Sequence, residues 1–483
     1  MTFPQKTASS QKVIPITAMD EGKGKFFTAR VRIHPRTIQG LFARWRWVFV
    51  FLTQILFYGL PWLQWGHRQA VLFDLGARRF YIFGLVFYPQ DLIYLTGLLV
   101  ISALSLFLFT AVAGRLWCGY TCPQTVYSEI FMWIEHRIEG DRSARIRLDR
   151  SGMTLEKVAK RTAKHFVWIV LAFWTGFTFV GFFSPIRELG ASLVHGTIGA
   201  WGIFWICFYG FATYGNAGFM REQVCKYMCP YARFQGAMFD RDTLIVSYDE
   251  KRGEPRGPRI KSQAKSQAAH KANELGDCID CSLCVQVCPM GIDIRSGLQY
   301  ECIGCGLCVD ACDSVMDKFG YSRGLVRYAT QNGMAKNWSN KQILRHVFRP
   351  RVLIYGTILL LLTVGLFTSL VLRVPLKVDV VRDRASLARI AEGGMLENVY
   401  RLQLMNATEA EQEYSIQARG LNGLKVLPGE SIVVEPAQSR WVVLRLQVPY
   451  GSASAGSHKV YFDVKSANGQ SAVSEKATFI VPR

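Results

Sequence analysis

The chain has few histidines and lacks the common sequence signatures of haem, nicotinamide and flavin binding. Its eight histidines are scattered, and no long apolar segment carries the facing pair that bis-histidine haem would require. No Cys-x-x-Cys-His haem attachment motif occurs. No Gly-x-Gly-x-x-Gly stands at a strand–helix junction, so neither a nicotinamide nor a flavin site is supported.

Acidic residues are also scarce. The 36 Asp and Glu residues are outnumbered by 57 Lys and Arg, which gives a formal net charge of +21. Such an excess is typical either of nucleic-acid binding or of basic loops retained on the cytoplasmic side of a membrane. Long apolar runs favour the membrane, so we expect no nucleic-acid partner. The first forty residues contain no apolar h-region, and we expect no removable signal peptide.

Five segments are apolar over the roughly 20 residues that a helix needs to cross a bilayer. Trp and Tyr gather near several of their ends, as in interfacial belts. A buried helix of a soluble protein is the alternative for any one of them. Together they predict an α-helical transmembrane bundle of about five spans: Trp47–Trp65, Leu92–Ala113, Phe166–Ile186, Thr197–Met220 and Val352–Val374.

The basic residues predict the orientation of these spans. Ten Lys and Arg lie between Arg115 and Lys164, whereas the loop Gly66–Tyr88 has three arginines and the loop Arg187–Gly196 has one. The positive-inside rule therefore places the N-terminus and both long loops in the cytoplasm. The C-terminal region is expected outside, in the periplasm.

Changes in composition along the chain predict a multidomain membrane protein. Short alternating segments such as Tyr400–Met405 and Trp441–Val448, separated by turn signals, predict an all-β immunoglobulin-like sandwich without a disulfide. A basic linker could rest on anionic lipid, or could have no such role. The expected regions are a cytoplasmic arm (1–45), a four-helix membrane domain (46–250), the linker (251–272), a ferredoxin domain (273–318), a connector with the fifth span (319–374) and the sandwich (375–483).

The ferredoxin domain is predicted by eight cysteines in two identical arrays: Cys278-x2-Cys281-x2-Cys284-x3-Cys288 and Cys302-x2-Cys305-x2-Cys308-x3-Cys312. This spacing holds paired 4Fe–4S clusters in bacterial-type ferredoxins, where the fourth cysteine of each run ligates the other cluster. Zinc would use four thiolates per site, which does not explain two complete four-cysteine runs. A disulfide framework is disfavoured in the cytosol. We expect an inserted α+β domain with two 4Fe–4S clusters, one held by Cys278, Cys281, Cys284 and Cys312, the other by Cys302, Cys305, Cys308 and Cys288.

Small residues between these ligands, Gly304, Gly306 and Ser282, should leave backbone amides free to approach the cluster sulfurs. Electrons carried by the clusters must come from another protein or from a membrane quinol.

Four further cysteines form two Cys-x3-Cys-Pro motifs, Cys118/Cys122 and Cys225/Cys229, which we call the paired-motif cysteines. Each motif follows a pair of apolar segments, which suggests a diverged internal repeat. Proline favours the first position of a helix, so Cys122 and Cys229 are expected at N-caps where the helix dipole lowers the thiol pKa. An apolar stripe after Pro123 predicts an amphipathic helix at the membrane surface: Val126, Ile130, Trp133, Ile134 and Ile138.

Together these four thiols could bind a soft ion, above all Cu(I), or another metal centre. They could instead cycle between dithiol and disulfide while passing electrons. The plainer alternative is that four small apolar residues pack at helix ends. We favour a redox or metal site because the motif is duplicated with its prolines, whereas Cys207 stands alone and is expected only to pack.

The motifs Trp117-Cys-Gly-Tyr-Thr-Cys-Pro-Gln and Val224-Cys-Lys-Tyr-Met-Cys-Pro-Tyr, the ferredoxin runs and the sandwich together resemble the CcoG family, also called FixG or RdxA. The resemblance implies an accessory protein of bacterial cytochrome c oxidase in the cytoplasmic membrane, which reduces Cu(II) to Cu(I) for assembly of the cbb-type enzyme. It implicates Cys118, Cys122, Cys225 and Cys229 as catalytic and copper-binding residues. One departure from the ferredoxin pattern is Asp313, where proline usually follows the last cysteine.

The leading hypothesis is therefore an electron relay feeding a cupric reductase-type oxidoreductase. Membrane lipid, a cytosolic electron donor and copper-delivery or oxidase-assembly proteins are the expected partners, and a homo-oligomer is possible. Two alternatives are a NapH-like, quinol-linked electron carrier and a non-enzymatic iron–sulfur scaffold.

Overall fold

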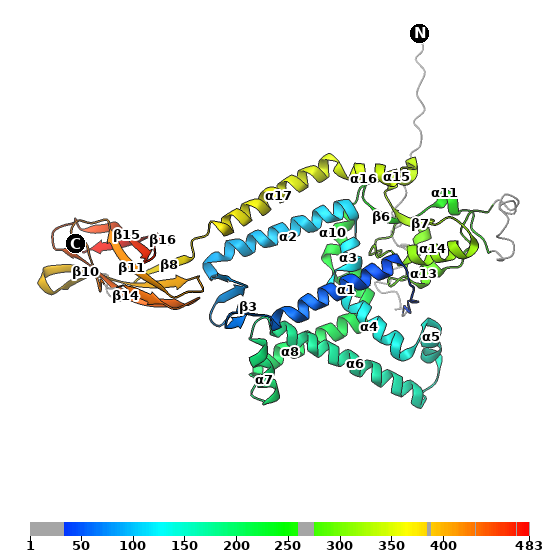
Figure 1. The fold of residues 1–483 in the computed structure, drawn as a ribbon, viewed down its shortest axis with the longest axis horizontal. Coiled ribbons are helices and arrows are strands. Elements are labelled where there is room, and N and C mark those ends of the chain that lie inside the picture. Colours follow the sequence, from blue (N-terminus) through cyan, green and yellow to red (C-terminus); the bar gives the residue numbers. More distant parts are fainter. Residues whose placement is uncertain (1–32, 259–274, 384–387, 430, 470, 483) are drawn as a thin grey trace, which may run out of the picture. The chain divides into compact units, whose positions relative to one another are not determined.

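The computed structural model describes residues 33–258, 275–383, 388–429, 431–469 and 471–482 (Figure 1). It divides into two compact units. The first contains Ile101–Val180, His195–Leu360 and the chain up to Gly59, and the second contains Leu60–Val100, Gly181–Val194 and Leu361–Arg483. Most of the expected basic arm (1–32) and of the linker (259–272) lies outside the described residues.

Among the described residues, three helices are long and apolar enough to cross a membrane. They are the run Pro89–Ala113, which ends in α2 (Leu92–Ala113), then α6 (Leu155–Val180) and α17 (Pro350–Val371). These helices correspond to the second, third and fifth predicted spans. However, α6 begins well before Phe166, because its basic first turns continue the same helix.

The first and fourth predicted spans are helical but do not meet this criterion. Helix α1 (Leu41–Gly59) starts and ends earlier than predicted and carries Arg44 and Arg46 in its first turns. Helix α8 (Ala200–Thr213) has only 14 residues and continues as the π-helix η3 (Tyr214–Met220). A count of five spans therefore stays a proposal. The expected loop Arg187–Gly196 is mostly helix α7 (Ile186–Val194).

Helix α6 packs closely against two other helices of the first unit. Gly176 of α6 faces α8, where an added Cβ would overlap the carbonyl oxygen of Ile206 and lie 3.0 Å from the nitrogen of Gly210. On its other side, α6 stacks Trp168 on Phe131 of α4 (Pro123–Glu139), with ring centroids 5.1 Å apart. The stripe predicted after Pro123 is therefore helical, but its helix packs inside this unit and buries charged residues as well.

The iron–sulfur region also belongs to the first unit and has the expected α+β character. Strand β6 (Ile245–Tyr248) pairs antiparallel with β7 (Val326–Ala329) beside α13 (Leu283–Gln286) and α14 (Leu307–Phe319). Asp310 of α14 accepts hydrogen bonds from the backbone nitrogens of Phe42 and Ala43, and so caps α1. Further short helices of this unit are α5 (Arg142–Arg150), α9 (Arg221–Gln223), α11 (Glu250–Gly253), α15 (Gln331–Lys336) and α16 (Asn340–Arg345).

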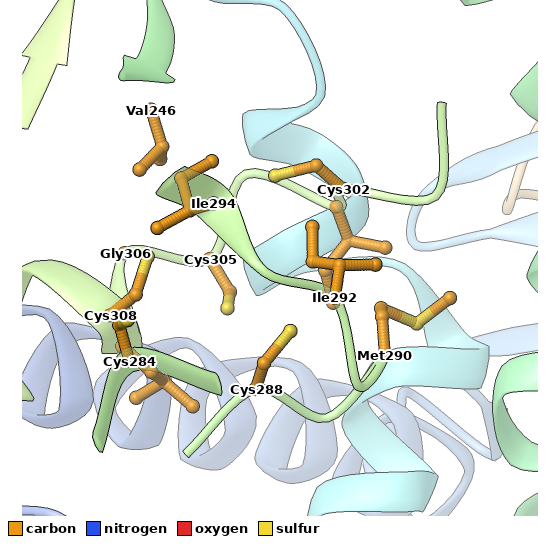
Figure 2. A pocket seen from close by; sticks show the side chains of 12 residues that line it. Val246, Cys284, Cys288, Met290, Ile292, Ile294, Cys302, Cys305, Gly306 and Cys308 are labelled. Atoms are coloured by element: carbon orange, nitrogen blue, oxygen red, sulfur yellow. The ribbon is translucent and has the colours of Figure 1, made fainter. Parts of the chain in front are cut away.

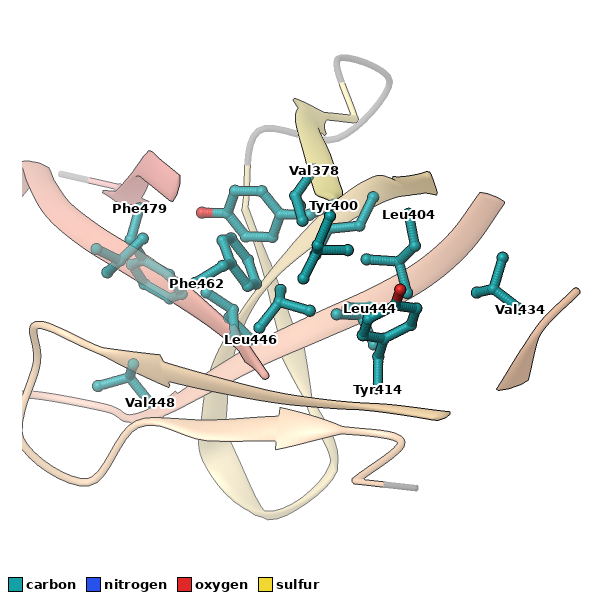
Figure 3. Close-up of a cluster of buried hydrophobic side chains, with 14 of the residues drawn as sticks. Val378, Tyr400, Leu404, Tyr414, Val434, Leu444, Leu446, Val448, Phe462 and Phe479 are labelled. Atoms are coloured by element: carbon teal, nitrogen blue, oxygen red, sulfur yellow. The ribbon is translucent and has the colours of Figure 1, made fainter. Parts of the chain in front are cut away.

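The second unit contains the C-terminal β-sandwich. One sheet has the order β12-β14-β10-β8, with β9 beside β10, and the other has the order β13-β11-β15-β16. Alternating side chains of both sheets, such as Tyr400, Leu444 and Phe462, fill the core between them (Figure 3). The strands are β8 (Leu376–Arg382), β9 (Arg389–Ala391), β10 (Met395–Asn406), β11 (Gln412–Arg419), β12 (Lys425–Leu427), β13 (Ile432–Val434), β14 (Ser439–Pro449), β15 (Gly456–Ser466) and β16 (Ala472–Val481).

A small antiparallel sheet of β3 (Val71–Asp74), β4 (Arg79–Ile82) and β5 (Leu85–Phe87) packs on this sandwich. Tyr88 donates a 3.0 Å hydrogen bond to the carbonyl of Asn406. Asp91, at the start of the α2 run, forms ion pairs with Arg373 and Lys377. These contacts hold the second unit together.

Candidate iron–sulfur and cysteine site

The eight ferredoxin-type cysteines line two neighbouring pockets, which share Cys284. We call the first the inner pocket; it is lined by Cys288, Cys302, Cys305 and Cys308, and also by the shared Cys284. In Figure 2 the sulfurs of Cys288 and Cys305 point toward one another. The second, the outer pocket, is lined by Cys278, Cys281, Cys284 and Cys312. Each pocket thus contains the four cysteines that the crossing rule assigns to one cluster.

The two runs share an unusual backbone. Asp280 and Ser282 have positive φ angles of 50° and 54°, and the equivalent Gly304 and Gly306 have 64° and 73°. These left-handed residues turn the chain so that a helix, α13 or α14, starts directly after each turn. In the sequence, Gly304, Gly306 and Ser282 stand out as small residues beside the ligands, and the approach of their amides to cluster sulfurs stays a prediction. Neither these left-handed turns nor the strained φ of Asp280 was anticipated.

The pockets fit a multi-atom iron–sulfur group better than a single metal ion. Within the described ranges, no three His, Cys, Asp or Glu side chains gather within reach of one ion. The cysteines instead surround apolar space, as ligands of a cube-shaped cluster do. Burial raises the pKa of Cys302 to about 12 and that of Cys288 to about 11. Bound iron would supply the positive charge that these buried thiolates need.

The paired-motif cysteines occupy equivalent places in two helical turns. Cys118 lies in α3 (Leu116–Tyr120), and Cys122 is the N-cap of α4. Cys225 lies in the π-helix η4 (Val224–Met228), and Cys229 is the N-cap of α10 (Pro230–Met238). Both prolines stand at the first helical position, as predicted.

Folding brings the two motifs into one electrostatic neighbourhood. Burial raises the pKa of Cys118 to about 11, and the charges of Cys122 and Cys229 act in the same direction. Burial likewise raises the pKa of Cys225 to about 12, again with contributions from the other three. The backbone N–H groups of Thr125 and Gln124 act to lower the pKa of Cys122, as expected at an N-cap, but burial outweighs them and raises it.

The paired-motif cysteines adjoin the inner pocket. Cys118 belongs to the same buried apolar cluster as Met290, Ile303 and Cys305, with Cys225, Cys288 and Cys302 at its edge. Tyr120 donates a 3.1 Å hydrogen bond to the carbonyl of Cys305. Local sequence patterns could not indicate this contact, since the two segments are far apart along the chain.

Arg115 lies between these two sets of cysteines. Its side chain donates to Gln235 Oε1 at 2.8 Å and to the backbone carbonyls of Tyr300 and Cys302, the latter at 3.4 Å. Gln235 Oε1 also accepts from Cys118 Sγ at 3.3 Å. In the sequence, Arg115 is only the first basic residue of the loop that precedes the third apolar segment, and nothing there indicated these hydrogen bonds.

Sequence reasoning also missed a buried charge cluster behind the first motif. Glu135 of α4 accepts from Arg221 at 3.0 Å and from Arg145 at 3.3 Å, and Lys164 lies 2.6 Å from Glu139. The signal in the sequence was the spacing of Glu135 and Glu139, two carboxylates one helical turn apart beside the apolar stripe of a predicted helix.

Arg221 joins this cluster to the second motif, since it lies four residues before Cys225. Its φ of 27° is strained for a residue with a side chain. Gln124, next to Pro123 of the first motif, donates a 3.1 Å hydrogen bond to the carbonyl of Arg221. The two motifs are therefore tied together through their flanking residues.

Comparison with known proteins agrees with this architecture. Family models described as a 4Fe-4S dicluster domain, a 4Fe-4S binding domain and an IG-like fold at the C-terminus of FixG match residues 220–331, 95–140 and 366–482. The nitrogen fixation protein FixG of Rhizobium meliloti is 39% identical over 83% of this chain and 81% of its own. The chain belongs to the FixG/RdxA family.

Protein RdxA of Cereibacter sphaeroides is also 39% identical, over 89% of this chain and 92% of its own. A crystal structure of a FixG-related protein from Vibrio parahaemolyticus matches 22% of this chain and 95% of its own, at 25% identity and a TM-score of 0.21. This FixG/RdxA chain is therefore a membrane iron–sulfur protein of electron transport, with ferredoxin-type 4Fe–4S domains and an immunoglobulin-like C-terminal domain.

Proposed function

We propose that this protein reduces Cu(II) to Cu(I) at the paired-motif cysteines, for assembly of a cbb-type cytochrome c oxidase. Cys278, Cys281, Cys284 and Cys312 would hold one 4Fe–4S cluster, and Cys288, Cys302, Cys305 and Cys308 the other. When bound, these clusters supply single-electron transfer. Each Cu(II) ion takes up one electron from a reduced donor protein, and soft thiolates stabilise the Cu(I) product.

One observation carries the proposal: the packing of Cys118 with Cys305 in a single buried cluster. The first motif therefore packs directly against the wall of the inner pocket. At the outer pocket Cys281 is exposed. A donor protein would therefore contact the outer pocket, while copper would meet the opposite end of the relay.

The membrane arrangement is part of the same proposal. Basic residues between Arg115 and Lys164 favour a cytoplasmic location for the iron–sulfur region. Five spans with the N-terminus inside would leave the sandwich in the periplasm of a bacterial cytoplasmic membrane. There it could contact copper-delivery proteins, oxidase-assembly proteins or a second copy of the chain.

The test uses anaerobically purified full-length protein with its iron–sulfur sites loaded and pre-reduced. We compare wild type, a variant with all four paired-motif cysteines replaced by Ser, and the matched control Cys207→Ser. After addition of weakly chelated Cu(II), cluster reoxidation is followed by absorbance and Cu(I) by a chromogenic chelator. The fourfold variant should reoxidise at least about tenfold more slowly, and the control should match wild type. An unchanged rate in the fourfold variant would refute the proposal.

A further inference from the structure

We propose that Arg115 is the shared counter-ion of the inner pocket and the paired-motif cysteines, and that it sets the redox potential of the inner site. The copper part of this inference rests on the proposed function, whereas the redox part does not. Arg115 is only 6% exposed. Its guanidinium is bonded to neutral oxygen atoms of Gln235, Tyr300 and Cys302.

No carboxylate within the described ranges forms an ion pair with Arg115. The other deeply buried arginines each have such a partner: Arg46 lies 2.8 Å from Glu129, and Arg145 lies 3.3 Å from Glu135. A buried charge is costly unless an opposite charge or a full set of hydrogen bonds compensates it. The missing negative charge is therefore expected from the cysteine-ligated centres themselves.

The position of Arg115 allows it to serve both centres at once. On one side it bonds the backbone carbonyl of Cys302, a residue of the inner pocket. On the other side it shares Gln235 Oε1 with the thiol of Cys118.

A fixed positive charge favours the more negative state of a nearby centre. Reduction adds one negative charge to an iron–sulfur site, so Arg115 should raise the potential of the inner site. It should affect the outer site much less, because none of its hydrogen bonds reaches that pocket. Thiolate-bound Cu(I) is also anionic, so the same charge should strengthen its binding.

The first experiment measures the potentials of both iron–sulfur sites by redox titration with electron paramagnetic resonance. Arg115→Gln removes the charge, Arg115→Lys retains it, and Gln235→Glu supplies a carboxylate 2.8 Å from Arg115 without removing the arginine. Arg233→Gln, an exposed residue of the same helix as Gln235, is the control.

Arg115→Gln and Gln235→Glu should each make one-electron reduction of one site at least tenfold less favourable, which corresponds to 59 mV. In both variants the potential of the other site should shift less. Arg115→Lys and the control Arg233→Gln should shift the potentials of both sites less. If Arg115→Gln loses iron, Gln235→Glu decides the question on a complete protein. A smaller shift in Gln235→Glu, or equal shifts at both sites, would overturn the assignment.

The second experiment measures Cu(I) affinity by competition with a chromogenic chelator. Arg115→Gln should weaken binding at least tenfold, while Arg233→Gln should not. If the fourfold cysteine variant binds Cu(I) as tightly as wild type, the proposed copper site fails. A shift of the inner potential in the same preparations would still support Arg115 as its counter-ion. Unchanged Cu(I) affinity in Arg115→Gln, with affinity lost in the fourfold variant, would limit Arg115 to the iron–sulfur site.

Discussion

Gly119 lies directly against the backbone of Cys305: an added Cβ would come within 2.9 Å of Cys305 Cα and of the carbonyl oxygen of Ile303. Both of these are backbone atoms, which cannot move aside as the end of a flexible side chain can. The approach of the first Cys-x3-Cys-Pro motif to the inner pocket therefore depends on the absence of a side chain at this position. Tyr120, the next residue, then bonds the carbonyl of Cys305.

We therefore expect Gly119→Ala to slow electron transfer out of the inner site. The added methyl group forces α3 away from the loop that carries Cys305, and overpacking of this kind typically costs about 1–3 kcal/mol. Reoxidation of pre-reduced protein by Cu(II) should slow, while iron content stays that of wild type. Stopped-flow absorbance measures the rate.

Gly356→Ala in α17 is the matched control for this experiment, because no atom lies within 4 Å of its added Cβ. It should leave the reoxidation rate unchanged. If Gly119→Ala also reoxidises at the wild-type rate with full iron content, the contact between Gly119 and Cys305 is not on the route.

The crossing arrangement of the eight cysteines predicts which single substitutions are equivalent. Cys312→Ala should remove the same iron–sulfur signal as Cys281→Ala, because both residues line the outer pocket. Cys308→Ala should instead remove the signal that Cys288→Ala removes. Iron analysis and electron paramagnetic resonance of reduced protein distinguish the two pairs. Loss of one signal in both Cys308→Ala and Cys312→Ala would contradict the crossing.

Local patterns made much of the architecture predictable. The cysteine spacing, the prolines after Cys122 and Cys229, and the alternation around Tyr400 each reflect contacts within a few residues or within one regular element. These features predicted the iron–sulfur region, the two helix starts and the sandwich. The apolar runs predicted where helices lie. The observed helix ends differ from the predicted ones where basic first turns or a π-helix continue the helix.

Features that depend on contacts between distant segments could not be predicted in this way. The pKa of Cys122 is raised because neighbouring helices bury it, and a local dipole argument contains no such burial. The bonds of Arg115 join residues 120 and 187 positions away. The ion pair between Glu135 and Arg221 likewise exists only after α4 and the short helix α9 have packed.

Glu135 should be critical for the stability of the first unit. Glu135→Gln would leave Arg145 and Arg221 without their shared carboxylate partner in a buried site. Breaking a buried ion pair in this way typically costs about 3–5 kcal/mol. Thermal unfolding of purified protein in detergent, followed by circular dichroism, should show a clearly lower midpoint.

Glu156→Gln is the control for charge loss, since Glu156 also pairs with a lysine but is 70% exposed. Its unfolding midpoint should match that of wild type, because exposed i, i+4 pairs contribute little. Equal midpoints for both variants would mean that the buried cluster contributes no net stability.

Packing of α6 against α8 should depend on Gly176. An added Cβ would meet backbone atoms of Ile206 and Gly210, so Gly176→Ala must push the two helices apart. We expect a lower unfolding midpoint, equivalent to about 1–3 kcal/mol. Gly365→Ala in α17 has open space around its Cβ and should be neutral or stabilising by up to about 1 kcal/mol, since alanine favours the helix. If the two alanine variants unfold at the same temperature, then α6 and α8 do not make this close contact.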